Sequence, residues 1–435
     1  MKKSSPFVQG TLILTAANIF SRFIGFYNRI FLAGLIGAHQ MGVYQLIFPI
    51  YLVGFALCFH GYETALSQIV AAQMAKGRPE NCRKILKITL AVTIFLSIIC
   101  ACFLFFFADE LCMKFLHEKD CIPCLQAAVF AMPFVGIKAC IHSYHIGLGK
   151  PGLPSVSLCI EQISRVLGIY AVSVTFFLKL ETPALIAVLG MVAGEMASCL
   201  YTVIYHLLKV KRQKSRMPAA SSRKLLGNLL SLSFPLTCNS LSITLLQSLE
   251  NILIPLMLTR FYSNQHYSVE IYGILTGMAI PFINFPSSIT NSISVMLLPK
   301  VSAATAEQDY RTLHRATKYS LTFCFLLGII SFFLFFALGP SIGVIVFHSE
   351  KAGMFLRMLS FLCPVLYLSG TLSSILNGLG KTKTTLFNNS VSLMLRIAFI
   401  VFVVPYVGIN GYLWGLMAST LLVVIMHYRK IRQRQ

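Results

Sequence analysis

Long apolar segments recur along the whole chain and are separated by short polar stretches. A window of about 20 residues, the length of a helix that crosses a bilayer, finds twelve of them. They cover residues 8–35, 43–72, 87–107, 122–147, 153–178, 183–207, 226–258, 271–298, 318–338, 353–378, 384–405 and 411–428. This pattern predicts an all-α polytopic membrane protein with about twelve transmembrane helices.

Lysine and arginine residues gather in alternate loops between these segments. The loops on the side of the N-terminus hold most of them, and the opposite loops hold only Lys114, Lys119, Lys179, Arg260 and Lys351. Because cytoplasmic loops are enriched in basic residues, we expect both termini to be cytoplasmic in a bacterial cell membrane. The basic stretch 209–224 then predicts a cytoplasmic linker between a six-helix lobe at 1–208 and a second at 225–435, which ends in a basic tail.

Composition supports a membrane protein, with 56% hydrophobic and 11% charged residues. The net charge of +22 would suggest nucleic-acid binding in a soluble chain, but the basic residues lie in the loops and indicate topology instead. Most of the thirteen cysteines are scattered through apolar segments, and the pair Cys121 and Cys124 has no second pair to complete a zinc site. We therefore expect no metal, no cofactor and no nucleic-acid partner.

A repeated motif indicates internal duplication. GLGKP at 147–151 recurs as GLGKT at 378–382, an offset of 231 (378 − 147). Arg165 and Arg396 follow the lysine of their motif at the same spacing, an offset of 15 in each case (165 − 150 and 396 − 381). A weaker echo, LSQIV at 66–70 and LPKVS at 298–302, has nearly the same offset as the motif itself. Because each half contains an even number of spans, the two lobes are predicted to be parallel repeats.

The first apolar segment carries polar residues on one helical face. Asn18, Arg22, Gly25 and Arg29 are spaced by four, three and four residues. A charge at mid-bilayer costs roughly 2.5–3.5 kcal/mol even on the lenient insertion scale, so two arginines in one span indicate a function. We interpret this face as the wall of a substrate cavity. The alternative is that one or both arginines extend to the membrane surface or pair with an acid on another helix.

Further charges lie inside later segments. Glu161 and Arg165 are four residues apart and could either form a structural ion pair or serve a substrate. Arg396 has no acid four residues away, so its partner is expected to be a ligand or an acid such as Glu195 or Glu250. Lys138 is a further cavity candidate. The mid-span cations Arg22, Arg29, Lys138, Arg165 and Arg396 outnumber the acids Glu63, Glu161, Glu195 and Glu250 by five to four, which predicts a cavity that favours an anion.

Prolines interrupt several spans. The eighth combines Pro281 and Pro286 with Asn284 and other polar residues, which suits a helix that lines a cavity and moves. Signatures of hydrolases, metalloproteases and P-loop ATPases are missing from the sequence, so we expect a transporter and not an enzyme. Energy would come from an ion gradient, the membrane potential or the substrate gradient.

Five motifs together resemble a known family: SRFIGFYNR at 21–29, GVYQLIFPIY at 42–51, EQISRVLGI at 161–169, YGILTGMAIPFINFPSSIT at 272–290 and GINGYLWG at 408–415. The ordered set is similar to the polysaccharide-biosynthesis branch of the multidrug/oligosaccharidyl-lipid/polysaccharide flippase superfamily, and most closely to its stage V sporulation protein B-like members. The resemblance covers nearly the whole chain. Relatives commonly have proline where this chain has Glu63, and many carry fourteen spans.

The resemblance implies two six-helix lobes around a V-shaped cavity that opens alternately to each side. It also implies a polyprenyl-pyrophosphate-linked saccharide as cargo, with membrane lipids around the protein and a coupling cation such as sodium or a proton. Arg22 matches the S-R-x-x-G motif of the related lipid II flippases, whose second arginine falls where this chain has Asn28 and then Arg29. A cation-coupled drug exporter of the same fold and a membrane-embedded glycosyl or phosphosaccharide transferase remain alternatives.

Overall fold

The protein consists of helices joined by short turns in the part of the chain that the computed structural model describes, residues 6–176, 182–209 and 221–432. The first half contains α1 (Pro6–Leu46), α2 (Phe48–Phe55), the π-helix η1 (Ala56–His60), α3 (Gly61–Ala75), α4 (Pro79–Phe106), α5 (Ala108–Leu111), η2 (Cys112–Leu116), α6 (Cys121–Val129), α7 (Met132–Gly147), α8 (Gly152–Phe176) and α9 (Ala184–Lys209). Of the expected linker at 209–224, residues 210–220 lie outside the described residues.

The second half contains the remaining helices. They are α10 (Ser222–Tyr262), α11 (Gln265–Gly273), the π-helix η3 (Ile274–Ala279), α12 (Ile280–Ile283), α13 (Ser287–Ala306), α14 (Tyr310–Phe347), α15 (Glu350–Ser360), α16 (Cys363–Gly378), α17 (Thr382–Phe402), α18 (Val404–Val407) and α19 (Ile409–Arg432). Proline occupies one of the first two positions of α12, α16 and α18, where its missing N–H has no helical partner.

Eight helical segments of the described chain are long and apolar enough to cross a membrane, and eleven are if three bent helix pairs each count as one span. One of the eight, Ile19–Ala75, has 57 residues, more than twice the roughly 20 of one crossing. The chain is therefore a multi-pass membrane protein, as the hydropathy pattern predicts. Counting that segment as two crossings gives the twelve expected spans.

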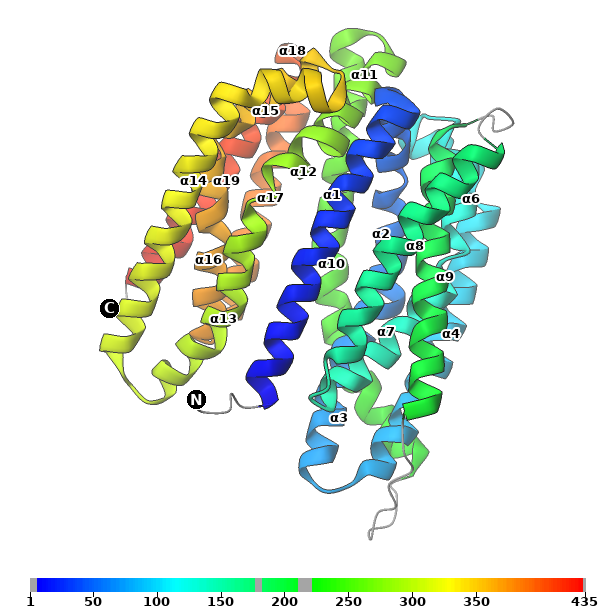
Figure 1. Ribbon diagram of the computed structural model, residues 1–435, viewed down its shortest axis with the longest axis vertical. Coiled ribbons are helices and arrows are strands. Elements are labelled where there is room, and N and C mark those ends of the chain that lie inside the picture. The colour runs from blue at the N-terminus through cyan, green and yellow to red at the C-terminus, as the bar shows by residue number, and fades with distance from the viewer. Residues whose placement is uncertain (1–5, 177–181, 210–220, 433–435) are drawn as a thin grey trace. The chain divides into compact units, whose positions relative to one another are not determined.

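The chain forms two compact units. Unit 1 comprises Met1–Asn28 and Leu46–Ser248, and unit 2 comprises Arg29–Gln45 and Leu249–Gln435. The long helices α1 and α10 thus contribute to both. In unit 1, α8 and α9 run side by side and α7 packs against α3, α4 and α9 (Figure 1). In unit 2, α16 packs against α13, α14 and α19. These units describe packing, so the division into lobes at 1–208 and 225–435 stays a prediction.

The internal repeat extends to helix bounds and turn geometry. Both ends of α16 follow those of α7 at the offset of the sequence motif, 231 (363 − 132 and 378 − 147), as does the start of α14 relative to α4 (310 − 79). Each repeat then turns on a glycine with positive φ, 70° at Gly149 and 76° at Gly380, a conformation that suits glycine at a helix C-terminus. The N–H groups of Lys150 and Lys381 both donate, at 2.9 Å, to the carbonyl five residues earlier.

A helix crossing in unit 2 shows the same offset. Gly42 of α1 and Gly273 of α11 are related by an offset of 231 (273 − 42) and lie against each other. A methyl group at Gly42 would overlap the carbonyl oxygen of Val269, and one at Gly273 would overlap that of Ala38, which precedes Val269 by the same offset (269 − 38). Only residues without a Cβ allow the two backbones to approach so closely.

Candidate functional site

Four charged side chains form one network in unit 1. The ammonium group of Lys138 on α7 donates to Glu161 Oε2 of α8 at 2.8 Å and also to Glu195 Oε2 of α9. The Arg165 guanidinium lies 2.8 Å from Glu161 Oε1 and 3.9 Å from Glu195 Oε1. Each cation therefore faces both carboxylates, and the formal charges of the network cancel.

Close packing of α8 and α9 places the two acids side by side. A methyl group at Gly194 would lie 2.8 Å from the Glu161 carbonyl oxygen, and one at Gly190 would lie 3.1 Å from that of Arg165. Small residues let helix backbones approach in a membrane, where packing and polar contacts drive association. The side chains of Lys138 and Glu161 are only 10% exposed and that of Arg165 is 20% exposed, so the network is largely buried.

A second charged cluster lies in unit 2. Arg396 Nη1 of α17 is 3.1 Å from Glu250 Oε1 of α10, and its Nε donates to the Ser419 hydroxyl of α19 at 3.1 Å. The Tyr412 hydroxyl also donates to Glu250 Oε1, at 3.2 Å. Of the two acids predicted as partners of Arg396, Glu250 is the one that pairs with it. Glu195 belongs to the cluster in unit 1.

The first helix differs from these clusters. Arg22 is exposed, and within the described residues its guanidinium has no hydrogen bond or ion pair. Arg29 is half-buried and interacts with a neighbouring group. Asn28 is buried, and its amide oxygen has no hydrogen-bond partner among the described residues. The side chain of Asn18 lies outside what the structure describes, so the predicted polar face of α1 is described from Arg22 onward.

The expected excess of positive charge changes when these contacts are counted. Lys138, Arg165 and Arg396 are each compensated by a glutamate of the same unit. The sequence suggested the Glu161–Arg165 pair and the Glu250 partner, but it did not indicate that Lys138 joins Glu161 to Glu195. Their role in substrate binding stays a prediction, and Arg22 is the candidate whose charge is available to a ligand.

Asn284 lies at a break between two helices of unit 2. The segments Gln265–Ile283 and Ser287–Ser294 are bent by 58°. The Asn284 N–H donates to the Ile280 carbonyl at 3.0 Å, and its carbonyl accepts from the Ser287 hydroxyl at 2.7 Å. The Tyr367 hydroxyl donates to the Ile283 carbonyl at 2.7 Å, so carbonyls at the break accept hydrogen bonds from side chains.

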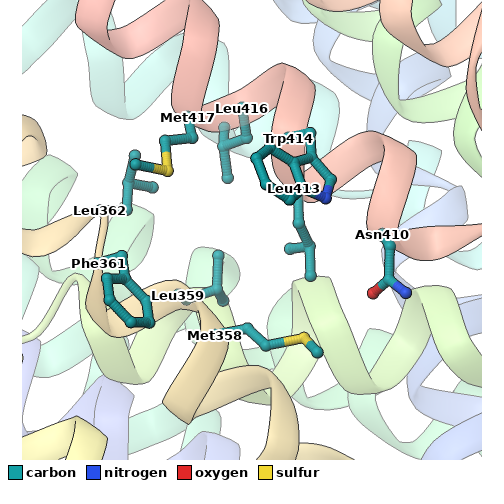
Figure 2. Close-up of a pocket in the computed structure, with 9 residues that line it drawn as sticks. All are labelled: Met358, Leu359, Phe361, Leu362, Asn410, Leu413, Trp414, Leu416 and Met417. Carbon is teal, nitrogen blue, oxygen red and sulfur yellow. The ribbon is translucent and has the colours of Figure 1, made fainter.

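An apolar groove lies elsewhere in unit 2, where α15 bends into α16 and α19 passes beside the bend. It has a volume of about 500 Å³ and is lined by Met358, Leu359, Phe361, Leu362, Asn410, Leu413, Trp414, Leu416 and Met417. Figure 2 shows the side chains of α19 on one side and those of the α15–α16 junction on the other. Its lining has one amide and no charge, so it could take up a hydrocarbon chain and not a phosphate.

The arrangement defines a polytopic membrane protein with buried ion pairs, broken helices and an internal repeat, which is typical of secondary transporters. The family model described as polysaccharide biosynthesis protein matches residues 7–305, and a second, described as MatE, matches residues 240–402. The chain belongs to the polysaccharide biosynthesis protein family, within the multidrug/oligosaccharidyl-lipid/polysaccharide flippase superfamily. This family is one of transporters, and the resemblance found in the sequence is confirmed.

Curated relatives support this assignment. The chain is 27% identical over 428 residues to stage V sporulation protein B of Bacillus subtilis (strain 168), covering 97% of this chain and 82% of that protein. It is 22% identical over 435 residues to sporulation protein YkvU of the same organism, covering 98% of this chain and 95% of the relative.

Solved structures show the same fold. The lipid II flippase MurJ in an inward closed conformation aligns with a TM-score of 0.75 at 16% identity, covering 97% of this chain and 87% of MurJ. An inward-facing multidrug resistance MATE family transporter aligns with a TM-score of 0.71 at 15% identity, covering 100% and 98%. At these identities the likeness concerns the fold alone.

Proposed function

We propose that this protein is a flippase that moves a polyprenyl-pyrophosphate-linked saccharide from the cytoplasmic to the outer leaflet of the cell membrane, by alternating access and without covalent chemistry. Membership of the polysaccharide biosynthesis family is the observation that carries the proposal. The cargo would serve cell-wall, spore or polysaccharide synthesis, in keeping with the relatives named for sporulation. Both termini would lie in the cytoplasm, as the distribution of basic residues predicts.

Arg22 is the residue that we assign to the phosphates. Its guanidinium is exposed and has no partner within the described residues, so its charge is available to a ligand. A guanidinium binds two phosphate oxygens at once through a planar fork of N–H groups, which a lysine cannot reproduce. Arg29 would be a secondary site on the same helix.

The paired cations would have a different part in transport. Lys138, Arg165 and Arg396 are already neutralised, so a pyrophosphate could bind them only by displacing a glutamate. Exchange of a glutamate for a phosphate would couple substrate binding to rearrangement of the helices that carry the pair. Until such an exchange occurs, these pairs stabilise each unit.

A transport assay with variants of Arg22 tests this assignment. Wild-type protein in proteoliposomes should translocate a short fluorescent polyprenyl-pyrophosphate sugar, Arg22→Ala should lose most of that activity, and Arg22→Lys should recover only part because it lacks the fork. Arg357→Ala is the matched control, because Arg357 is also an exposed arginine but packs over the ring of Phe336 at 4.6 Å. Unchanged transport by Arg22→Ala at normal expression would refute the assignment.

A second candidate function is cation-coupled drug export. The MatE match and the three glutamates in the membrane-spanning part of unit 1, Glu63, Glu161 and Glu195, favour it. A drug exporter should bind a lipophilic cationic dye, and Glu195→Gln should abolish that binding while Arg22→Ala leaves it intact. The flippase proposal instead predicts that Arg22→Ala abolishes movement of the pyrophosphate lipid.

A further inference from the structure

Glu63 is a carboxylate within the long apolar helical segment Ile19–Ala75. It lies in the first turn of α3, directly after the π-helix η1, and its side chain is partly buried. Twelve residues separate it from the end of α3 at Ala75, which places it about 18 Å along the helix from that end. An ionisable residue at this depth is costly, and it points to a function unless a partner neutralises it.

The structure gives Glu63 no such partner. Within the described residues its carboxylate forms no ion pair and no hydrogen bond. Lys138 of α7 acts on it electrostatically, but the Lys138 ammonium already donates to Glu161 and Glu195. Because that network is neutral on its own, ionised Glu63 adds an uncompensated negative charge beside it.

The other polar groups on neighbouring helices do not neutralise Glu63 either. On α7 the Cys140 thiol pairs with the Thr93 hydroxyl of α4, and the His142 ring with the Thr202 hydroxyl. Further ionisable or polar side chains lie on the elements that pack against α3 and beside Glu63 in the chain. They include Ser143, Tyr144 and His145 of α7, Arg83, Lys84 and Lys87 of α4, Ser233 and Thr237 of α10, and Cys58, His60 and Tyr62.

We infer that Glu63 is a proton-binding site, and that its protonation and deprotonation couple proton movement to transport. The step is R–COO⁻ + H⁺ ⇌ R–COOH. The neutral acid removes the extra charge from the apolar surroundings. The ionised form is favoured when Lys138 releases Glu161 or Glu195 and pairs with Glu63 instead. A proton needs only one oxygen of a single carboxylate, whereas a metal cation such as Ca²⁺ needs several oxygen ligands at once.

Chemical labelling tests the site without any substrate. Dicyclohexylcarbodiimide reacts with protonated carboxyl groups in apolar surroundings, and the modified peptide is identified by mass spectrometry. We expect Glu63 to be labelled in purified wild-type protein, with the yield falling as the pH rises, and Glu161, Glu195 and Glu250 to stay unlabelled because each forms an ion pair with a lysine or arginine. Glu63→Asp keeps a carboxyl and should be labelled, whereas Glu63→Gln should not.

Glu110→Gln is the control for the substitution itself, because Glu110 is an exposed acid paired with Lys114. It should leave labelling of Glu63 unchanged. Absence of label at Glu63 from mildly acidic to mildly alkaline pH, or equal label on the paired glutamates, would overturn the inference.

Coupling to transport rests on the proposed flippase function and needs a second measurement. The readout is the ratio of translocation rates of the fluorescent pyrophosphate lipid with and without a pH gradient across the proteoliposome. We expect the ratio to differ from one in wild type and to return to one in Glu63→Gln. A gradient response that persists in Glu63→Gln would overturn the coupling. If wild-type protein moved no lipid at all, the proposed function would fail while the labelling still decided the proton site.

Discussion

Glu250 and Arg396 form a salt bridge of 3.1 Å between α10 and α17, and Glu250 is only 5% exposed. The pair joins two helices that lie far apart in the sequence. Removing one member of a buried pair strands the other charge, which costs on the order of 3 kcal/mol. We expect Glu250→Gln to lower the thermal unfolding midpoint of detergent-purified protein clearly.

The exposed pair of Glu110 and Lys114 is the control for this prediction. Its side chains are 60% and 70% exposed, so Glu110→Gln should change stability by no more than about 0.5 kcal/mol. Replacing both buried partners, Glu250→Gln with Arg396→Met, should recover part of the loss. Equal midpoints for Glu250→Gln and Glu110→Gln would show that the buried pair is not stabilising.

Each repeat contains a contact between a threonine hydroxyl and a cysteine thiol, and the two residue types occupy opposite helices in the two repeats. Thr93 of α4 contacts Cys140 of α7 at 3.2 Å, and the positions equivalent to them in the second repeat hold Cys324 of α14 and Thr371 of α16, 3.1 Å apart. A hydroxyl and a thiol therefore face each other in both repeats with the helices exchanged. The double variant Thr93→Cys/Cys140→Thr rebuilds the second arrangement in the first repeat.

We expect this double variant to unfold close to the wild-type midpoint. Thr93→Val alone removes the bond at a similar side-chain volume and should cost about 1 kcal/mol. Thermal unfolding of the three proteins in one detergent is the measurement. A double variant less stable than Thr93→Val would indicate that the two repeats do not pack equivalently at this contact.

The close approach of Gly42 to α11 predicts that adding a methyl group has very different effects at two glycines of α1. A methyl group at Gly42 would overlap the Val269 carbonyl, whereas one at Gly34 of the same helix meets no atom within 4 Å. We expect Gly42→Ala to destabilise the protein by about 1–3 kcal/mol through overpacking. Gly34→Ala should be neutral or stabilising, since alanine favours the helix. Similar unfolding midpoints for the two variants would contradict the crossing.

Tyr367 is expected to hold the break beside Asn284. Its hydroxyl is the donor to the buried Ile283 carbonyl, so Tyr367→Phe should cost about 1–3 kcal/mol by leaving that acceptor unsatisfied. Tyr319→Phe is the matched control because Tyr319 is 71% exposed. Limited proteolysis and thermal unfolding should separate the two variants, and indistinguishable behaviour would show that the bond does not hold the break.

Much of the fold could be predicted from local patterns. Apolar segments of about 20 residues place the spans because a bilayer accepts only helices with their backbone groups satisfied. The equal spacing from Lys150 to Arg165 and from Lys381 to Arg396 revealed a repeat that the helix bounds now show. The predicted end of the first span at residue 35 lies close to Gly37, whose φ of 76° and ψ of 174° interrupt the helical backbone within α1.

The candidate site was less predictable, because partners depend on tertiary packing. Glu161 and Arg165 share a helical face, so their pairing could be expected from spacing alone. The contact of Lys138 with Glu195 depends on how α7 and α9 pack, which no local pattern specifies. The isolation of Glu63 likewise depends on tertiary packing, because Lys138, the cation that acts on it, already donates to Glu161 and Glu195.

Translocation by the wild-type protein tests the central claim most directly. Protein reconstituted in liposomes would be supplied with a fluorescent polyprenyl-pyrophosphate saccharide in one leaflet, and a membrane-impermeant quencher would report its arrival in the other. The proposed function predicts protein-dependent translocation of this lipid and no transport of a lipophilic cationic dye. Dye transport without movement of the lipid would contradict it and would establish drug export instead.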